Sequence, residues 1–453
     1  MSRCKPCGYS FFFVVSAATL ACGVDNGSPV DGADGGILSV GSSETDGLDG
    51  ETGTGGLPGS GDSGFDEGGD DADEGIKFDI PASPDGQPGC GGEQEQAFSY
   101  IWIANSSQGT VSKIDTKTGV EEGRYRTAPG SSESPSRTSV NQYGDVAVGN
   151  RNGQGYVTKI AATLDRCVEQ NGIPGIQTST GPNDILAWGE DECVLWSTPM
   201  PISSNGPRAI AWEGGELDPV TCQNTVPNPR LWVGWDTNPQ RLVRLDGETG
   251  ALIDDVNLGN ASGRIYGGGV DGGGNMWMVN RGANRLFRVD ALSLAVQTWA
   301  IPGVPYGMGV DANGDPWINT YSGGPNNDRV WRFDTALEEF VDAGSGGGYY
   351  RGMNLDRQGR AWIAGNQPCR LGVWDATTDT LIDDAIPLPG CGTPVGVSID
   401  HDGFVWVVDQ NGTAYKIHPD THQVELTVGG LTGPYTYSDM TGAGLNLVVN
   451  PPG

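Results

Sequence analysis

A nine-residue phrase recurs four times in the second half of the chain. In each copy an Asp is followed three positions later by Gly and six positions later by Trp. The copies are Gly269–Trp277, Gly309–Trp317, Asn354–Trp362 and Ser398–Trp406, so the tryptophans lie 40, 45 and 44 residues apart. A period of about 40–50 residues made of short strands is typical of propeller blades. The phrase therefore predicts an all-β fold, a β-propeller.

The number of blades follows from the position of this Trp in each repeat. Alternating segments such as Tyr100–Asn105 and Gly109–Asp115 break at Asn, Asp or Gly, which predicts antiparallel hairpins. Only the interval between Ala147 and Trp232 is long, and it predicts an insertion in a seven-bladed ring. Six or eight blades remain alternatives. The markers are Trp102, Ala147, Trp232, Trp277, Trp317, Trp362 and Trp406.

Two segments are candidates for closing the ring. The first repeat begins in mid-blade, without an inner strand, which favours closure around Phe98–Ala104. The alternative is a strand at Leu445–Val449, after the last repeat, that joins the first blade. A closed ring removes the open sheet edges that promote aggregation.

The Asp, Gly and Trp of the phrase have a structural explanation. Asp can hydrogen-bond its own turn, and Gly accepts a positive φ. The Trp on the next strand is expected to pack between blades. We therefore assign a structural role to these tryptophans and to Asp271, Asp311, Asp356 and Asp400.

Residues 1–22 are predicted to be a bacterial secretion signal. Arg3 and Lys5 precede a mainly apolar run that is too short to span a bilayer as a stable helix. Thr19–Gly23 resembles a lipobox, in which Cys22 becomes the lipidated first residue. Ordinary cleavage nearby without a lipid is the alternative. We expect an exported protein at the bacterial outer membrane or cell surface, with a lipid anchor as its membrane contact.

Residues 23–96 are dominated by Gly, Asp, Ser and Glu. They contain 18 acidic residues and one basic residue, Lys77, and so supply more than half of the net charge of −31. Such a segment buries too little apolar area to offset its chain entropy, which predicts a disordered tether. The propeller is then expected over residues 97–453. Neither part has a basic stripe, which argues against nucleic acid as a partner.

Six cysteines remain once Cys4, Cys7 and Cys22 are assigned to the signal and the anchor. An even number in an exported chain favours disulfides, whose pairing the sequence leaves open. We favour a Cys369–Cys391 bond, because both residues lie within one blade. The six are Cys90, Cys167, Cys193, Cys222, Cys369 and Cys391.

Two propeller families resemble the repeats between about residues 98 and 430. Ile101–Gly119 resembles the YVTN-type repeat of surface-layer and extracellular propellers. Pro305–Asn319 resembles a blade of the streptogramin (virginiamycin B) lyases. The resemblance implies the propeller fold, and it says little about chemistry because propellers host many functions.

The resemblance also implies a test for lyase chemistry. That family uses a His before the Gly of an inner strand, a Glu at the end of the next strand, and Mg²⁺. No corresponding pair here is His with Glu, and His401, His418 and His422 lie elsewhere, so lyase chemistry is not expected. The pairs are Ser136 with Asn150, Tyr266 with Asn280, Tyr306 with Thr320, Arg351 with Gly365, and Val395 with Asp409.

The same register predicts which side chains face the funnel near the central channel. Aromatic rings there can stack on sugars or peptide side chains, and Arg and Asn can give fixed hydrogen bonds. We interpret the chain as a monomeric, non-enzymatic binding or scaffold propeller for a carbohydrate, peptide or protein. The alternative is a hydrated funnel without a ligand. The candidates are Asn105, Asn150, Arg151, Arg208, Trp235, Tyr266, Asn280, Arg281, Tyr306, Arg351 and Asp409.

A metal-dependent propeller hydrolase or lyase is the rival hypothesis. Lactonase-type propellers hold a metal through Glu, Asn and Asp at the funnel, and Asn150, Asn280 and Asp409 could supply part of such a set. Ca²⁺ or Mg²⁺ would then be the cofactor, whereas the binding hypothesis expects none. One carboxylate with neutral amides makes a weak site for a divalent ion. A purely structural surface protein is a third possibility.

Overall fold

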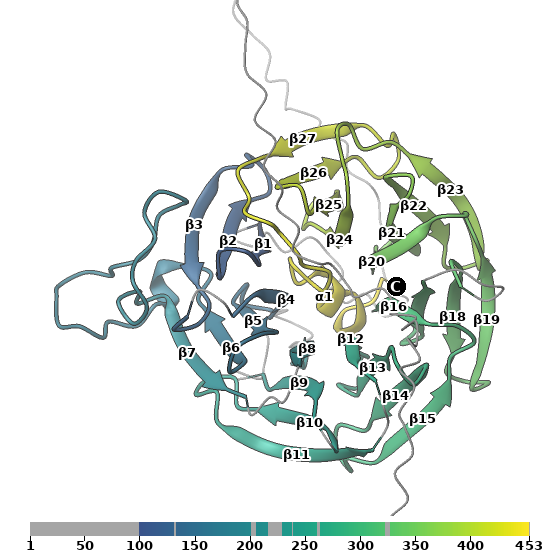
Figure 1. Ribbon diagram of the computed structural model, residues 1–453, viewed down its shortest axis with the longest axis horizontal. Coiled ribbons are helices and arrows are strands. Elements are labelled where there is room, and N and C mark those ends of the chain that lie inside the picture. The colour runs from purple at the N-terminus through teal and green to yellow at the C-terminus, as the bar shows by residue number, and fades with distance from the viewer. Residues whose placement is uncertain are drawn as a thin grey trace, which may run out of the picture. The chain divides into compact units, whose positions relative to one another are not determined.

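The computed structural model describes residues 99–130, 133–200, 205–215, 229–237, 239–260, 263–321 and 327–452. Over these residues the chain forms seven antiparallel sheets arranged as the blades of a ring (Figure 1). The expected seven-bladed β-propeller is confirmed. The expected signal, Cys22, the tether, Cys90 and Cys222 lie outside the described residues.

The strands run outward from the channel in chain order within each blade. The first blade has three strands, β1 (Tyr100–Asn105), β2 (Thr110–Asp115) and β3 (Glu121–Arg126). The innermost strands of the other six are β4 (Pro135–Val140), β8 (Asn205–Trp212), β12 (Ile265–Val270), β16 (Pro305–Val310), β20 (Tyr349–Leu355) and β24 (Pro394–Ile399). Their second strands are β5 (Val146–Asn150), β9 (Leu231–Asp236), β13 (Met276–Asn280), β17 (Pro316–Thr320), β21 (Arg360–Asn366) and β25 (Val405–Asp409).

The third and fourth strands complete these six blades. The third strands are β6 (Tyr156–Ile160), β10 (Gln240–Leu245), β14 (Arg285–Val289), β18 (Val330–Asp334), β22 (Arg370–Asp375) and β26 (Thr413–Ile417). The outermost strands are β7 (Val194–Pro199), β11 (Leu252–Gly259), β15 (Val296–Ala300), β19 (Glu339–Gly344), β23 (Thr380–Ile386) and β27 (Val424–Val428). Burial decreases outward, because β24 and β25 are buried throughout whereas β15 has no buried residue.

The recurring phrase forms the turn between the first two strands of four blades. In each turn the Asp carboxylate accepts a backbone N–H of the turn and the indole N–H of the Trp. In the sixth blade Trp362 Nε1 donates to Asp356 Oδ2 at 2.8 Å, and Gly359 has a φ of 73°, which favours glycine. The structural role of Asp and Trp is confirmed, and the indole bond explains their fixed spacing. We call this side of the ring the turn face and the opposite side the funnel face.

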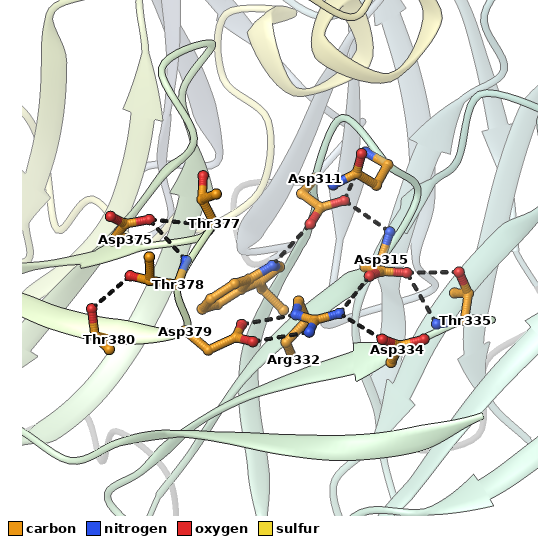
Figure 2. A network of polar contacts seen from close by, with 12 residues as sticks. Asp311, Asp315, Arg332, Asp334, Thr335, Asp375, Thr377, Thr378, Asp379 and Thr380 are labelled. Carbon is orange, nitrogen blue, oxygen red and sulfur yellow. Dashed lines mark hydrogen bonds and ion pairs between the residues drawn. The ribbon is translucent and has the colours of Figure 1, made fainter. Parts of the chain in front are cut away.

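Ion pairs join neighbouring blades. Figure 2 shows Arg332 of β18, in the fifth blade, among three carboxylates. It donates to both oxygens of Asp379 in the sixth blade, at 2.8 and 2.9 Å, and to Asp315 at 2.7 Å. The hydrogen bond to Asp379 is the largest of the effects that raise the pKa of this guanidinium. The positive charge of Arg332 is therefore matched by negative partners.

The C-terminal segment closes the ring. Residues 434–440, which we call the closing segment, run beside β1: Asn105 bridges Pro434, Tyr435 N donates to Ala104 O at 3.2 Å, and Trp102 N donates to Met440 O at 2.9 Å. The closing segment thus takes the inner position that the first blade lacks. The interpretation that the first repeat begins in mid-blade is confirmed.

The alternative prediction of a strand at Leu445–Val449 is wrong, because these residues belong to helix α1 (Ala443–Val449). Asp439 holds the start of the helix, because its Oδ2 accepts a hydrogen bond from Leu445 N at 3.1 Å. Leu445, Leu447 and Val448 are buried. The helix lies at the centre of the ring (Figure 1), and Val448 contacts the region of Gly272 on the turn face.

Within the described residues, two disulfides hold connections between strands. Cys167 and Cys193 bracket the insertion between β6 and β7, which contains the short 3-10 helix η1 (Leu164–Arg166). Cys369 is joined to Cys391 within the sixth blade and its exit loop, with the Cα atoms 6.1 Å apart, which confirms that pairing. Within the described part of the chain, no helix has the length and apolar character needed to cross a membrane.

Candidate ligand-binding site

Four predicted funnel residues hold the loops of the funnel face. Asn105 Oδ1 accepts from Thr432 N at 2.9 Å, and Asn150 Nδ2 donates to Thr127 O at 2.9 Å. Asn280 Oδ1 accepts from Ala283 N at 2.9 Å. Asp409 accepts three backbone N–H groups, from Gly392, Thr393 and Asn411. All four side chains are buried, so their polar atoms serve the loops.

The donor set proposed for a metal is therefore engaged in these hydrogen bonds. Among the described residues, one group of His, Cys, Asp or Glu side chains brings its ligand atoms within 4.8 Å of one another, namely Cys369, Cys391 and Asp409. Its two sulfur atoms are joined in the disulfide, so they are not available as thiolates. These residues do not fit a divalent ion.

The inner strands lie close together around the channel. A Cβ atom on Gly307 would lie 2.1 Å from the carbonyl oxygen of Arg351, and one on Gly396 would lie 2.0 Å from that of Thr436. Only glycine fits such a backbone contact. The resulting channel is narrow enough for side chains of different blades to meet.

Nine side chains meet there, and we call them the Arg/Tyr cluster. Five come from inner strands, two from the closing segment, and two from the residues that directly follow β5 and β13. Six of the eleven predicted candidates belong to it, which are Arg151, Arg208, Tyr266, Arg281, Tyr306 and Arg351. The other three members are Arg137, Tyr435 and Tyr437, which the sequence reasoning missed.

The four phenols of the cluster form one hydrogen-bonded group. Tyr266 Oη lies 3.0 Å from Tyr435 Oη, and Tyr306 Oη lies 3.3 Å from the hydroxyl oxygens of both Tyr435 and Tyr437. Tyr437 donates to Tyr435 and is also bonded to Tyr266. All four rings are buried, and those of Tyr266 and Tyr306 are in edge contact at 4.9 Å.

The guanidinium groups lie over these rings. Arg137 lies 3.8 Å from the ring centroid of Tyr437, Arg151 lies 4.3 Å from that of Tyr435, and Arg208 lies 4.8 Å from that of Tyr266. A cation over an aromatic face is attracted by the ring quadrupole. The remaining pair, Arg281 and Arg351, lies over Tyr306 at 5.1 and 5.4 Å. Each arginine of the cluster therefore contacts at least one tyrosine ring.

The hydrogen-bond acceptors of three of these arginines, Arg137, Arg151 and Arg351, are neutral. Arg137 donates to the carbonyl oxygens of Ser136 and Tyr266, Arg151 to Ser134 Oγ, and Arg351 to Asn366 Oδ1 and Tyr306 Oη. Arg208 is 5% exposed, and its Nε and Nη1 have no hydrogen-bond partner among the described residues. The cluster is thus rich in buried positive charge.

This charge changes the acidity of the phenols. Burial raises the pKa of Tyr435, but the charges of Arg208 and Arg137 outweigh it and lower this pKa to about 7. Burial raises the pKa values of Tyr306 and Tyr437 well above the ordinary value. Because the four phenols share hydrogen bonds, they titrate as a coupled group, and the arginine charge favours the ionised form of Tyr435.

The carboxyl group of Asp236 lies near enough to the cluster to interact electrostatically with Arg208. Burial raises the pKa of Asp236, at the end of β9, to about 6, although the N–H of Ile265 and the charge of Arg208 act against this. Its Oδ1 accepts from Ile265 N at 2.7 Å. Asp236 therefore holds the backbone of the neighbouring blade, and its carboxyl group also interacts electrostatically with Arg208.

Trp235 lies outside the cluster. It is 3% exposed and lines a separate cavity of about 380 Å³ together with Met200 and Leu252. A second cavity, of about 510 Å³, lies between the fourth and fifth blades and is lined by Trp277 and Trp299. It includes turn-face residues, and its Trp277 indole N–H is already bonded to Asp271. We place the candidate site at the cluster, where buried donors lack partners.

The histidines do not approach this site. His401 lies in a turn between β24 and β25, and His418 and His422 follow β26. His422 Nδ1 lies 3.5 Å from Asp383 Oδ2 on an outermost strand. A His–Glu pair of the lyase type is therefore absent from the described inner strands.

The fold and this channel define a seven-bladed β-propeller with a cationic, tyrosine-lined funnel. No protein-family model matches the chain, and no curated protein matches it.

Solved structures of propellers are similar to it. A streptogramin B lyase structure is 14% identical, with 70% of this chain and 88% of that chain covered and a TM-score of 0.51. A functionally unknown protein from Desulfotomaculum acetoxidans is 10% identical, with coverage of 75% and 99% and a TM-score of 0.51. Virginiamycin B lyase from Staphylococcus aureus is 12% identical, with coverage of 68% and 92% and a TM-score of 0.47. The expected likeness to streptogramin lyases is confirmed for the fold alone.

Proposed function

We propose that this chain is a non-enzymatic binding propeller that takes a glycan, peptide or protein ligand at its funnel. The observation that carries the proposal is the meeting of five inner strands and the closing segment in the Arg/Tyr cluster. Arginine and tyrosine dominate the energetics of many binding interfaces. Buried donors in fixed positions, together with partly exposed arginines, favour the recognition of a ligand.

The composition of the cluster supports binding over catalysis. Acid–base catalysis needs a group that takes up and releases a proton within reach of the substrate. Histidine and glutamate are absent from the nine cluster residues, and Asp236 is held by Ile265 N. Tyr435 is buried among arginines and other phenols. A metal-dependent hydrolase or lyase would further need free ligand atoms, and those of Asn150, Asn280 and Asp409 are bonded to loops.

We further propose that the chain is exported and held at the bacterial surface through a lipid on Cys22. The disulfides Cys167–Cys193 and Cys369–Cys391 support this, because such bonds persist in oxidising compartments. A long acidic tether would hold the propeller away from the membrane. Incorporation of labelled palmitate that survives Cys22→Ser would contradict the anchor.

The binding proposal is tested by probing glycan, peptidoglycan and peptide arrays with the full chain. Tyr306→Ala, in the cluster, and Trp235→Ala, beside it, are compared with the wild type. Leu292→Ala serves as the control, because this side chain is 93% exposed and lies on an outer turn. Hits that weaken with Tyr306→Ala and persist with Leu292→Ala support a funnel site. Arrays without hits, or hits that all variants share, would count against it.

A further inference from the structure

The arginines of the funnel differ from two arginines on the third strands of their blades, Arg332 of β18 and Arg244 of β10. Arg332 has three carboxylate partners, and Arg244 pairs with Glu213 and Asp254. By contrast, four arginines of the Arg/Tyr cluster form no salt bridge among the described residues, namely Arg137, Arg151, Arg208 and Arg351. The chain has 57 acidic residues against 26 basic ones. Unmatched positive charge in so acidic a chain marks a local requirement for negative charge.

Arg208 presents this requirement most clearly. Its side chain is 95% buried, and its Nε and Nη1 lack hydrogen-bond partners among the described residues. A buried charge without hydrogen-bond partners is strongly unfavourable, because nothing replaces the water that it loses. Its guanidinium lies over Tyr266, whose hydroxyl meets those of Tyr435 and Tyr437 in the channel. The free donors therefore belong to the channel.

We propose that the Arg/Tyr cluster binds an oxyanion group of the ligand, a carboxylate, sulfate or phosphate, with Arg208 Nε and Nη1 as the central donors. This inference rests on the proposed binding function and names the chemistry that the funnel recognises. Guanidinium groups bind such anions through paired, charge-assisted hydrogen bonds. Arg151 and Arg351, which are half-buried, lie closer to solvent and guide the anion inward.

Without a ligand, the cluster supplies its own negative charge. Tyr435 lies among Arg137 of β4, Arg151 after β5 and Arg208 of β8, and is bonded to the hydroxyls of Tyr266, Tyr306 and Tyr437. Arg351 of β20 acts on the same group of phenols. A bound oxyanion and a tyrosinate at Tyr435 compete for the same arginines. Binding therefore takes up one proton from solvent, which converts the Tyr435 oxygen from phenolate to phenol.

The experiment is a titration of the full chain with sodium sulfate and sodium acetate at several pH values. Both probes stay ionised between about pH 6 and 9, and chloride of equal ionic strength is the reference. Thermal unfolding reports binding, because a ligand of the folded state raises Tm. Near-ultraviolet absorbance reports tyrosinate. The two probes distinguish a tetrahedral from a planar oxyanion, and glucose is the neutral control.

Three variants separate the proposal from a loss of folding. Arg208→Gln removes the central donors, and Arg241→Gln removes an arginine that pairs with Asp255 on an outer part of the third blade. Tyr435→Phe removes the internal competitor and leaves the arginines in place. We expect Arg208→Gln to weaken oxyanion binding about tenfold or more, because it removes charge-assisted hydrogen bonds to the anion. Arg241→Gln should bind as the wild type does.

Tyr435→Phe should strengthen oxyanion binding at high pH, whereas Arg208→Gln should weaken it. Above about pH 7 the wild-type affinity should fall about tenfold per pH unit, because binding takes up one proton. In Tyr435→Phe the affinity should stay level, and it should exceed that of the wild type at pH 9. Oxyanion addition should also reduce the tyrosinate absorbance of the wild type. This variant keeps the proposal falsifiable if Arg208→Gln does not fold.

The outcomes distinguish this inference from the proposed function. Absence of any response to sulfate and acetate, together with neutral array ligands that depend on Tyr306, would overturn the oxyanion and leave the binding site. No response and no array ligand would overturn both. A response that Arg208→Gln and Arg241→Gln share, with no dependence on Tyr435, would show an adventitious ion only and would also overturn the inference.

Discussion

Substitution of Tyr435 by Phe should remove a pH-dependent part of the stability of the propeller. The pKa of Tyr435 is lowered to about 7 by the arginines around it, whereas an unfolded tyrosine titrates near 10. Between these values the unfolded state holds a proton that the folded state has released. The free energy of unfolding therefore rises with pH in this window, and the contribution is lost as the pH falls through about 7.

The magnitude follows from the size of the shift. The difference between a pKa of about 7 in the folded state and the ordinary value near 10 sets a ceiling of about 4 kcal/mol. Between pH 7 and pH 9, the wild type should gain about 2 kcal/mol relative to Tyr435→Phe. Buried Lys113 and Lys159, whose pKa values are lowered by burial, add a pH dependence of the same sign. Their effect is common to both proteins and cancels in the comparison.

The assay is urea unfolding of the full chain and of Tyr435→Phe at pH 7, 8 and 9, in a buffer free of carboxylate, sulfate and phosphate. The variant also loses a hydroxyl from the network, so its absolute stability is expected to be lower at every pH. The difference between the two curves should nevertheless widen as the pH rises. A difference that stays constant to within about 0.5 kcal/mol would refute the assigned charge on Tyr435.

Three further predictions concern the frame of the propeller and its rival function. Asp356→Ala should lower the free energy of unfolding by about 2–4 kcal/mol, because Trp362, the turn N–H groups and Arg360 lose a buried acceptor; chemical denaturation checks this, with the exposed Asp402→Ala as a control within about 0.5 kcal/mol. Arg332→Lys should cost about 1–2 kcal/mol in the same assay, since lysine cannot bind Asp379 through two parallel bonds; a change equal to that of Arg241→Lys would contradict a special role. Addition of EDTA or Ca²⁺ should leave Tm unchanged, because Asn150, Asn280 and Asp409 are bonded to their loops; a shift of several degrees with either would revive the metal-dependent hydrolase.

The architecture could be predicted because one local bond repeats. The Asp carboxylate that holds its turn also accepts the Trp indole, so the two residues keep a fixed spacing that is visible without a structure. The marker Trp then placed Tyr266, Tyr306 and Arg351 at the funnel. The helix at Ala443–Val449 was harder to predict, since a short apolar run fits a helix or a strand equally well.

The missing members of the cluster come from the far end of the chain. Tyr435 and Tyr437 enter the channel because the closing segment takes the inner position of the first blade. The dipeptide Pro434–Tyr435 repeats Pro305–Tyr306, and this similarity was a usable signal. Conversely, no pattern in the sequence could tell whether the amide of Asn150 faces a ligand or its own loop. The orientation of the Asn150 amide depends on the backbone carbonyl of Thr127, which lies in the connection between β3 and β4.

The central claim is that the funnel recognises its ligand through the buried arginine charge of the cluster. The most direct measurement repeats the glycan and peptide arrays in parallel with the wild type, Arg208→Gln and Arg241→Gln. The account predicts hits that carry carboxylate, sulfate or phosphate groups, that vanish with Arg208→Gln and that persist with Arg241→Gln. Identical patterns for all three proteins, or a majority of neutral hits that Arg208→Gln retains, would contradict it.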